Sequence, residues 1–93
     1  MERILLTTDE IAARLAGLDG WETAAGKLHR RFEFDNFAAA LDFVNRVGTI
    51  AEELDHHPDI TFGWGYADIT TTTHDRGGIT DYDLTLAQRI NEL

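Results

Sequence analysis

The stretch from Phe37 to Leu54 constrains the fold of this 93-residue chain more than any other. Its apolar side chains recur at helical spacing, which predicts a long amphipathic helix capped by Asp35 or Asn36. Pro58, the only proline, follows closely and has no amide hydrogen, so the helix must end near residues 55–57. A helix with one apolar stripe has to bury that stripe against another layer of structure. The stripe consists of Phe37, Ala40, Leu41, Val44, Val47, Ala51 and Leu54.

Short segments with strand character flank this helix and can supply the second layer. The predicted strands are residues 21–24 and 28–34 before the helix, and residues 60–64 and 67–73 after it. Turns at residues 25–27 and at Gly65 and Tyr66 join the strands of each pair. Strands joined by turns this short form antiparallel hairpins.

Two capping boxes mark the remaining helices. Thr7 and Glu10 have the spacing of a capping box, and so have Thr80 and Asp83. We expect a first helix that ends by Gly20 and a last helix that runs toward the C-terminus. The predicted order is therefore αββαββα: one α+β domain over residues 1–93, with a four-stranded antiparallel sheet and the helices packed on one face.

Charge and composition narrow the classes of function. The formal net charge is −9, and the eight basic residues are scattered, which argues against nucleic acid or an anionic membrane as partner and favours a small neutral substrate. The chain has no cysteine, so a disulfide framework and a thiolate nucleophile are excluded. The aliphatic run near the N-terminus is far too short for a signal peptide or a membrane span, and we expect a cytoplasmic protein.

Three histidines fall at two points that the second hairpin brings together. His56 and His57 lie where the long helix meets the third strand, and His74 follows the fourth strand. With Gly65 and Tyr66 in the turn, the apolar residues of the two strands face one another, and the same count places His57 opposite His74. Facing side chains lie about 5 Å apart at Cβ. We therefore expect these two histidines to be neighbours.

Two carboxylates are candidates for the same cluster. Glu52 precedes His56 by one helical turn on the same face, and Asp83 lies in the first turn of the last helix. Imidazole groups exchange protons near neutral pH, so the cluster has the equipment for general acid–base catalysis. Simpler interpretations stay open: an exposed His-His-Pro connector, Asp83 as a cap only, Glu52 as a solvated helix residue, and Trp64 as a packing group.

A metal site is a further alternative, because imidazole is a common zinc ligand and catalytic sites with three histidines exist. The spacing gives this alternative little support. Adjacent histidines at a helix end diverge, unlike a pair four residues apart on one helical face. We therefore predict neither a metal nor an organic cofactor.

The stretch EELDHHPDITFGWGYADITTTTHDRGGITDYD resembles the signature of the pterin-4a-carbinolamine dehydratases, in which an acidic residue, His-His-Pro and an aromatic precede a histidine and an aspartate. The segment FEFDNFAAALDFVNRVGTIAEEL and the early Gly20 and Trp21 extend the likeness to nearly the whole chain. Ile60 departs from members that carry an aromatic there, which predicts a different shape of the pocket wall. The matching positions are Glu52, His56, His57, Pro58, Trp64, His74 and Asp83.

This resemblance implies the αββαββα fold and homodimers that share a continuous sheet, often paired into tetramers. It also implies dehydration of 4a-hydroxytetrahydropterin to quinonoid dihydropterin without metal or cofactor, after turnover of an aromatic amino-acid hydroxylase. His56 and His74 are then the proton-transfer pair and His57 holds the pterin. Glu52 and Asp83 orient imidazoles, and Trp64 lines the substrate pocket. The alternative within the family is a non-catalytic interaction module of the dimerisation-cofactor type.

Overall fold

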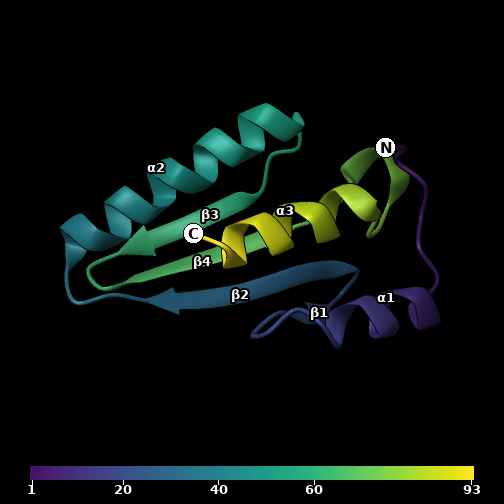
Figure 1. Ribbon diagram of the computed structural model, residues 1–93, viewed down its shortest axis with the longest axis horizontal. Coiled ribbons are helices and arrows are strands. Elements are labelled where there is room, and N and C mark those ends of the chain that lie inside the picture. Colours follow the sequence, from purple (N-terminus) through teal and green to yellow (C-terminus); the bar gives the residue numbers. More distant parts are fainter.

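The computed structural model describes residues 1–93 and has the order αββαββα, with one antiparallel sheet in the strand order β1-β2-β4-β3 (Figure 1). The predicted α+β class and element order are thus confirmed. A 3-10 turn, His74–Arg76, lies between β4 and α3. No helix has the length and apolar character needed to cross a membrane. The elements are α1 (Thr8–Leu15), β1 (Glu22–Ala24), β2 (Lys27–Glu33), α2 (Phe37–Leu54), β3 (Asp59–Gly63), β4 (Tyr66–Thr71) and α3 (Asp81–Asn91).

Helices α2 and α3 pack side by side on one face of the sheet (Figure 1). The apolar stripe of α2 supplies the fully buried Val47, as its helical spacing predicts. The buried Leu28 of β2 and Ile69 of β4 belong to the same core as Val47, and so does Leu84 of α3. Helix α1 contributes partly buried side chains to the same core. One core therefore fixes the position of every helix relative to the sheet.

The turn of the β3–β4 hairpin lies one residue earlier than the sequence predicts. Gly63 pairs with Tyr66, so Trp64 and Gly65 form the turn, whereas Gly65 and Tyr66 were expected there. Gly65 has φ +83°, a conformation that favours glycine. The Tyr66 ring packs across Gly63 so closely that a Cβ there would lie 2.8 Å from it. The paired positions consequently differ from the predicted ones by two residues.

Asp83 joins the start of α3 to the end of β4. Its Oδ2 accepts a hydrogen bond of 2.9 Å from the backbone N–H of Thr80, which closes the predicted capping box. The hydroxyl groups of Thr71 and Thr73 also donate to Asp83, at 2.6 Å and 2.8 Å. The Asp83 side chain is completely buried. Because a buried carboxylate is costly unless hydrogen bonds satisfy it, this contact network holds α3 in a defined position on the sheet.

The face of the sheet away from the helices carries a charged cluster. The guanidinium of Arg31 donates two hydrogen bonds to Asp68 on the neighbouring strand, at 2.9 Å and 2.8 Å. The ring of His29 lies 3.3 Å from the same carboxylate. The hydrogen bonds from Arg31 lower the pKa of Asp68 below its ordinary value, and the hydrogen bond with His29 adds to the shift. The ionised form of Asp68 therefore supports the β2–β4 pairing.

Replacing Asp83 with asparagine should lower the free energy of unfolding by about 3 kcal/mol, measured by urea unfolding. The amide nitrogen cannot accept hydrogen bonds, so at least one of the buried donors around it loses its partner. The matched control is Asp81→Asn in the same helical turn. Asp81 is half exposed and pairs with Arg14, so this control should cost at most about 1 kcal/mol. Equal losses for the two variants would contradict the role of Asp83.

The stabilisation from Asp68 should depend on pH. Its pKa is lower in the folded than in the unfolded chain, so the ionised carboxylate stabilises the fold above about pH 4, and this contribution is lost as the pH falls further. We expect Asp68→Asn to be less stable than the wild type at pH 7, with a difference that shrinks in acid, measured by chemical unfolding across pH. Asp59→Asn removes an exposed strand carboxylate without an ion pair and should show no such trend.

Candidate active site

The end of α2 aims two adjacent histidines in different directions. The helix ends at Leu54, and Asp55 takes a left-handed conformation with φ 51°. The backbone N–H of His56 then donates to the carbonyl of Ala51 at 3.0 Å, which closes the helix end. After this reversal His56 is buried, with 6% of its surface exposed, whereas His57 is exposed. His56 therefore lies beyond the helix, which corrects the prediction that it shares a helical face with Glu52.

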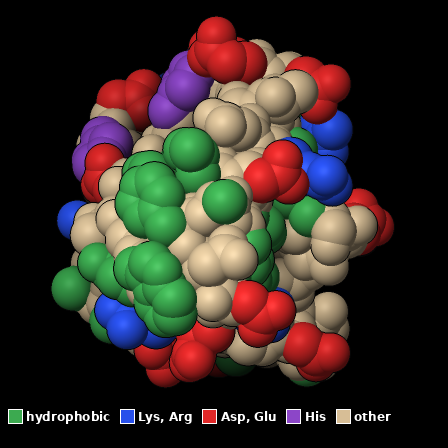
Figure 2. Space-filling model, turned by 90° about the vertical axis from the view of Figure 1, so that its left-hand side faces the viewer, with side chains coloured by type: hydrophobic (Ala, Val, Ile, Leu, Met, Phe, Trp, Pro, Cys, Tyr) green, Lys and Arg blue, Asp and Glu red, His purple; other side chains and the backbone are tan.

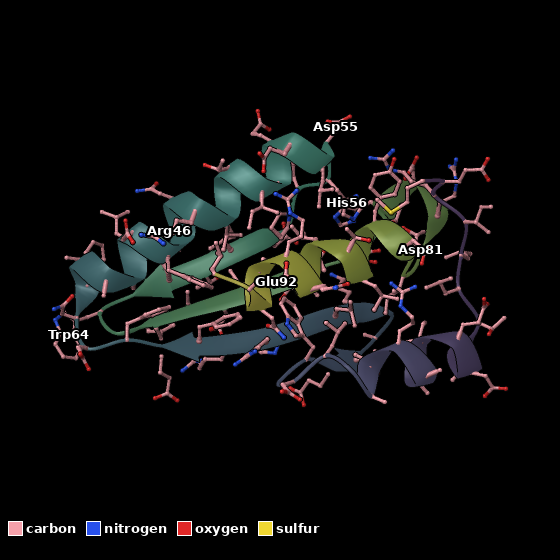
Figure 3. The ribbon with its side chains drawn as sticks, in the orientation of Figure 1. Arg46, Asp55, His56, Trp64, Asp81 and Glu92 are labelled. Atoms are coloured by element: carbon pink, nitrogen blue, oxygen red, sulfur yellow. The ribbon has the colours of Figure 1, made fainter.

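His56 lies between the end of α2 and the start of α3 (Figure 3), where it meets a buried carboxylate. Its Nε2 lies 2.6 Å from Oδ1 of Asp83, the oxygen that also accepts from Thr71. The carboxylate already accepts from Thr80, Thr71 and Thr73 and has no donor of its own, so its hydrogen bond with His56 requires a proton on Nε2 of that ring. Nδ1 of His56 makes no hydrogen bond in the chain, yet no buried side-chain nitrogen or oxygen lacks a partner. This nitrogen is consequently accessible, and in the neutral ring it is a free proton acceptor.

Glu52 contacts a different histidine from the one predicted. Its carboxylate forms a short hydrogen bond with Nε2 of His57, and both side chains are largely exposed. The prediction placed Glu52 beside His56 on one helical face, but the left-handed turn after Leu54 removes His56 from that face. Each of the two adjacent histidines thus has its own carboxylate partner, buried for His56 and exposed for His57.

His74 is the third histidine of the cluster and comes from the segment that follows β4. It begins the 3-10 turn after β4, is exposed, and its ring makes no hydrogen bond within the chain. His56, His57 and His74 line one pocket of about 350 Å³, which we call the histidine pocket. No apolar side chain lines it. The other lining residues are Arg3, Asp55, Thr72, Thr73 and Asp75.

The predicted pairing of His57 with His74 is wrong, although both line the pocket. Asp59 pairs with Thr70, so the continued register places residue 57 opposite residue 72. His74 reaches the pocket by another route. Thr73 forms an isolated bridge with Gly78, which closes the loop between them and turns His74 back toward the end of α2. His74 therefore lies in the same pocket as His57 because of this compact loop and not because of strand pairing.

Trp64 is not part of the histidine pocket of its own chain. It lies at the tip of the β3–β4 hairpin, at the end of the sheet away from His56 (Figure 3). Its side chain is 71% exposed. Strand β3 separates the two sites by roughly 20 Å at the usual rise per residue. Trp64 was expected to line the pocket, but it lies too far from the three histidines to do so within one chain.

Sequence reasoning missed several residues of the pocket and of the hydrogen-bond network around Asp83. For Thr71 and Thr73 a signal existed, since alternation along β4 puts both on the core face, where a buried hydroxyl needs an acceptor. Arg3 had no such signal, because it lies more than fifty residues from the other pocket residues in sequence. Its guanidinium donates to the carbonyl of Asp55 at 2.6 Å and lies 4.0 Å from the centre of the Tyr82 ring.

The arrangement provides proton transfer at fixed positions. A histidine whose far nitrogen is held by a buried carboxylate keeps one tautomer and one orientation, as His56 does here. His74 adds a second imidazole that can exchange protons with a bound molecule. No group of three or more His, Asp or Glu side chains has the geometry to hold a metal ion. General acid–base chemistry on a small molecule is what these residues supply.

Comparisons with known proteins identify the family of this chain. The family model described as pterin 4 alpha carbinolamine dehydratase matches residues 4–93. A relative from Rubrobacter xylanophilus that carries the name of this dehydratase is 48% identical over 89 residues, covering 95% of this chain and 83% of the relative. One of the same name from Mycolicibacterium smegmatis is 44% identical over 89 residues, covering 96% and 95%.

Solved structures show the same fold. The crystal structure of a transcriptional coactivator/pterin dehydratase from Brucella melitensis superimposes with a TM-score of 0.90 at 34% identity, covering 94% of this chain and 95% of that one. A pterin dehydratase-like protein identified as a RuBisCO assembly factor in the α-carboxysome gives a TM-score of 0.64 at 25% identity, covering 77% and 83%. With a matching family model over almost its full length, this chain belongs to the pterin-4a-carbinolamine dehydratase family.

Proposed function

We propose that this protein catalyses the dehydration of a 4a-hydroxytetrahydropterin to quinonoid dihydropterin. One observation carries the proposal: three histidines line one pocket, and the buried Asp83 fixes His56 with a free nitrogen accessible from it. Family membership supplies the substrate class. The chemistry requires an acid for the leaving hydroxyl group and a base for the ring N–H, and the pocket offers imidazoles for both.

The geometry supports different tasks for the histidines. Nδ1 of His56 accepts the proton from N5 of the pterin, and Asp83 stabilises the imidazolium that results. His74 donates a proton to the 4a-hydroxyl group, which leaves as water while the double bond between C4a and N5 forms. His57, steadied by Glu52 at the rim, binds the pterin. Exchange of one proton with solvent at each histidine then restores the starting state.

The physiological source of the substrate follows from its chemistry. A 4a-hydroxytetrahydropterin forms when a pterin-dependent aromatic amino-acid hydroxylase incorporates one oxygen atom into its substrate and leaves the other on C4a. We place this protein after such a hydroxylase, where it prepares the pterin for reduction. The reaction occurs slowly in water, so an acceleration of about 10²- to 10⁴-fold by positioned proton transfer suffices for this role.

His56→Gln and His74→Gln should each lower kcat by about 10²-fold, because each removes one proton-transfer group. His57→Gln should mainly raise KM, since it removes a binding contact. The measurement generates the carbinolamine enzymatically and follows its dehydration by absorbance. His29→Gln is the matched control, since His29 lies on the opposite face of the sheet and should keep wild-type activity. A wild-type rate equal to the uncatalysed rate would refute the enzyme assignment.

An exposed apolar patch supports self-association. Phe37, Leu41 and Trp64 are between 40% and 71% exposed, and the tilted rings of Phe37 and Phe62 pack with their centroids 5.5 Å apart. Figure 2 shows apolar side chains gathered at this end of the molecule. A monomer rarely leaves such a group in water. A homodimer or homotetramer is the assembly we propose, and the same patch is the feature that favours the second candidate, a non-catalytic interaction module.

Leu41→Glu should shift the protein toward monomer, because it places a charge in the apolar patch. Sedimentation velocity over a range of concentrations measures the change. Arg46→Glu lies on the same helix outside the patch, where Arg46 pairs with Asp42, and should leave the assembly unchanged. If both variants associate like the wild type, the patch is not the interface. If Leu41→Glu is monomeric and catalysis persists, each chain carries a complete site.

A further inference from the structure

The N-terminal segment, residues 1–6, lies over the elements that carry the histidine pocket. The backbone N–H of Leu6 donates to Ile79 at 3.0 Å, next to α3. The carbonyl of Arg3 accepts from Arg76 in the 3-10 turn at 2.9 Å. The hydroxyl of Tyr82 donates to the carbonyl of Met1 at 3.0 Å. The backbone of this segment is thus tied on both sides of Arg3.

The Arg3 side chain is held in place, but only one of its hydrogen bonds is made within the chain. Its Nη2 donates to the carbonyl of Asp55, next to His56, and its guanidinium stacks on Tyr82. Arginine carries five N–H donors, and the remaining ones have no hydrogen-bond partner within the chain. A fixed guanidinium with free donors loses little entropy when it binds a further acceptor.

Arg3 is also the only cation on the wall of the pocket, and it forms no ion pair. Asp55 and Asp75 line the same pocket, so even when His74 carries the proton that it donates, the wall has no excess of positive charge. An anionic ligand is therefore disfavoured. What Arg3 can recognise here is a neutral acceptor, such as a ring carbonyl, because a guanidinium only donates hydrogen bonds.

We infer that the Arg3 guanidinium is a specificity determinant that binds the C4 carbonyl oxygen of the pterin. This inference rests on the proposed function. C4 is bonded directly to C4a, the carbon that loses the hydroxyl group. When C4a lies between the imidazoles of His56 and His74, the C4 carbonyl is the strong acceptor closest to the reaction, and Arg3 is the free donor on the same pocket wall. Bound in this way, the carbonyl fixes the orientation of the ring.

The test compares two stable ligands that differ at C4. 6,7-Dimethylpterin has the carbonyl, and 2,4-diamino-6,7-dimethylpteridine has an amino group there, which gives Arg3 no such acceptor. Fluorescence titration gives Kd for each ligand with the wild type, Arg3→Met and Arg3→Lys. We expect Arg3→Met to reduce the preference for the pterin about 10-fold, as for one charge-assisted hydrogen bond, and Arg3→Lys to reduce it less.

The controls separate recognition from folding. Arg46→Met removes the same charge far from the pocket and should keep the wild-type preference. Tyr82→Phe loosens the segment at Met1 but keeps the ring beneath Arg3, so it should lower the preference less than Arg3→Met. An equal loss for both ligands, or an unchanged preference, in Arg3→Met overturns the inference. A wild type that binds neither ligand overturns it together with the proposed function. A wild type with the Arg3-dependent preference but without dehydration overturns only the function.

Discussion

The buried carboxylate of Asp83 is the interaction on which the site and much of the fold depend. It caps α3, accepts hydrogen bonds from the hydroxyl groups of Thr71 and Thr73 at the end of β4, and holds the ring of His56. No other single group connects the last helix, the central strand and the end of the long helix. A carboxylate is needed because four donors converge on two oxygens, and an amide has only one. The same group thus supports both the packing of α3 and the chemistry of the pocket.

Features with a local cause could be predicted from the sequence. The capping boxes, the apolar stripe of α2 and its end before Pro58 all arise from residues within one or two turns of each other, and the structure has them. The predicted register of the β3–β4 hairpin was wrong for a physical reason. A shift by two residues keeps every side chain on its original face, so the apolar pattern cannot distinguish the two registers. In the observed register the ring of Tyr66 packs across Gly63, a contact that the apolar pattern does not predict.

The candidate site was predictable in its residue types and less so in its contacts. The three histidines and Asp83 were identified from spacing and family resemblance, and they do lie together. Their partners depend on tertiary structure: Glu52 binds His57 because the chain reverses at Asp55, and Trp64 points away because β3 extends from the pocket to the hairpin tip. Arg3 joins the pocket through contacts with distant segments, which no local pattern in its own neighbourhood signals.

The left-handed turn at Asp55 makes two chemically identical neighbours unequal. The imidazole of His56 is buried and held in one tautomer by Asp83. The imidazole of His57, the next residue, is exposed to solvent. The reversal of the chain at Asp55 starts this difference, and the hydrogen bond to Asp83 holds the inner ring, so the number of residues between the helix and Pro58 matters as much as their identity. Inserting or deleting one residue there would exchange the inner and outer positions while leaving the amino-acid composition of the pocket almost intact. Loop length therefore helps to define the histidine pocket of this chain.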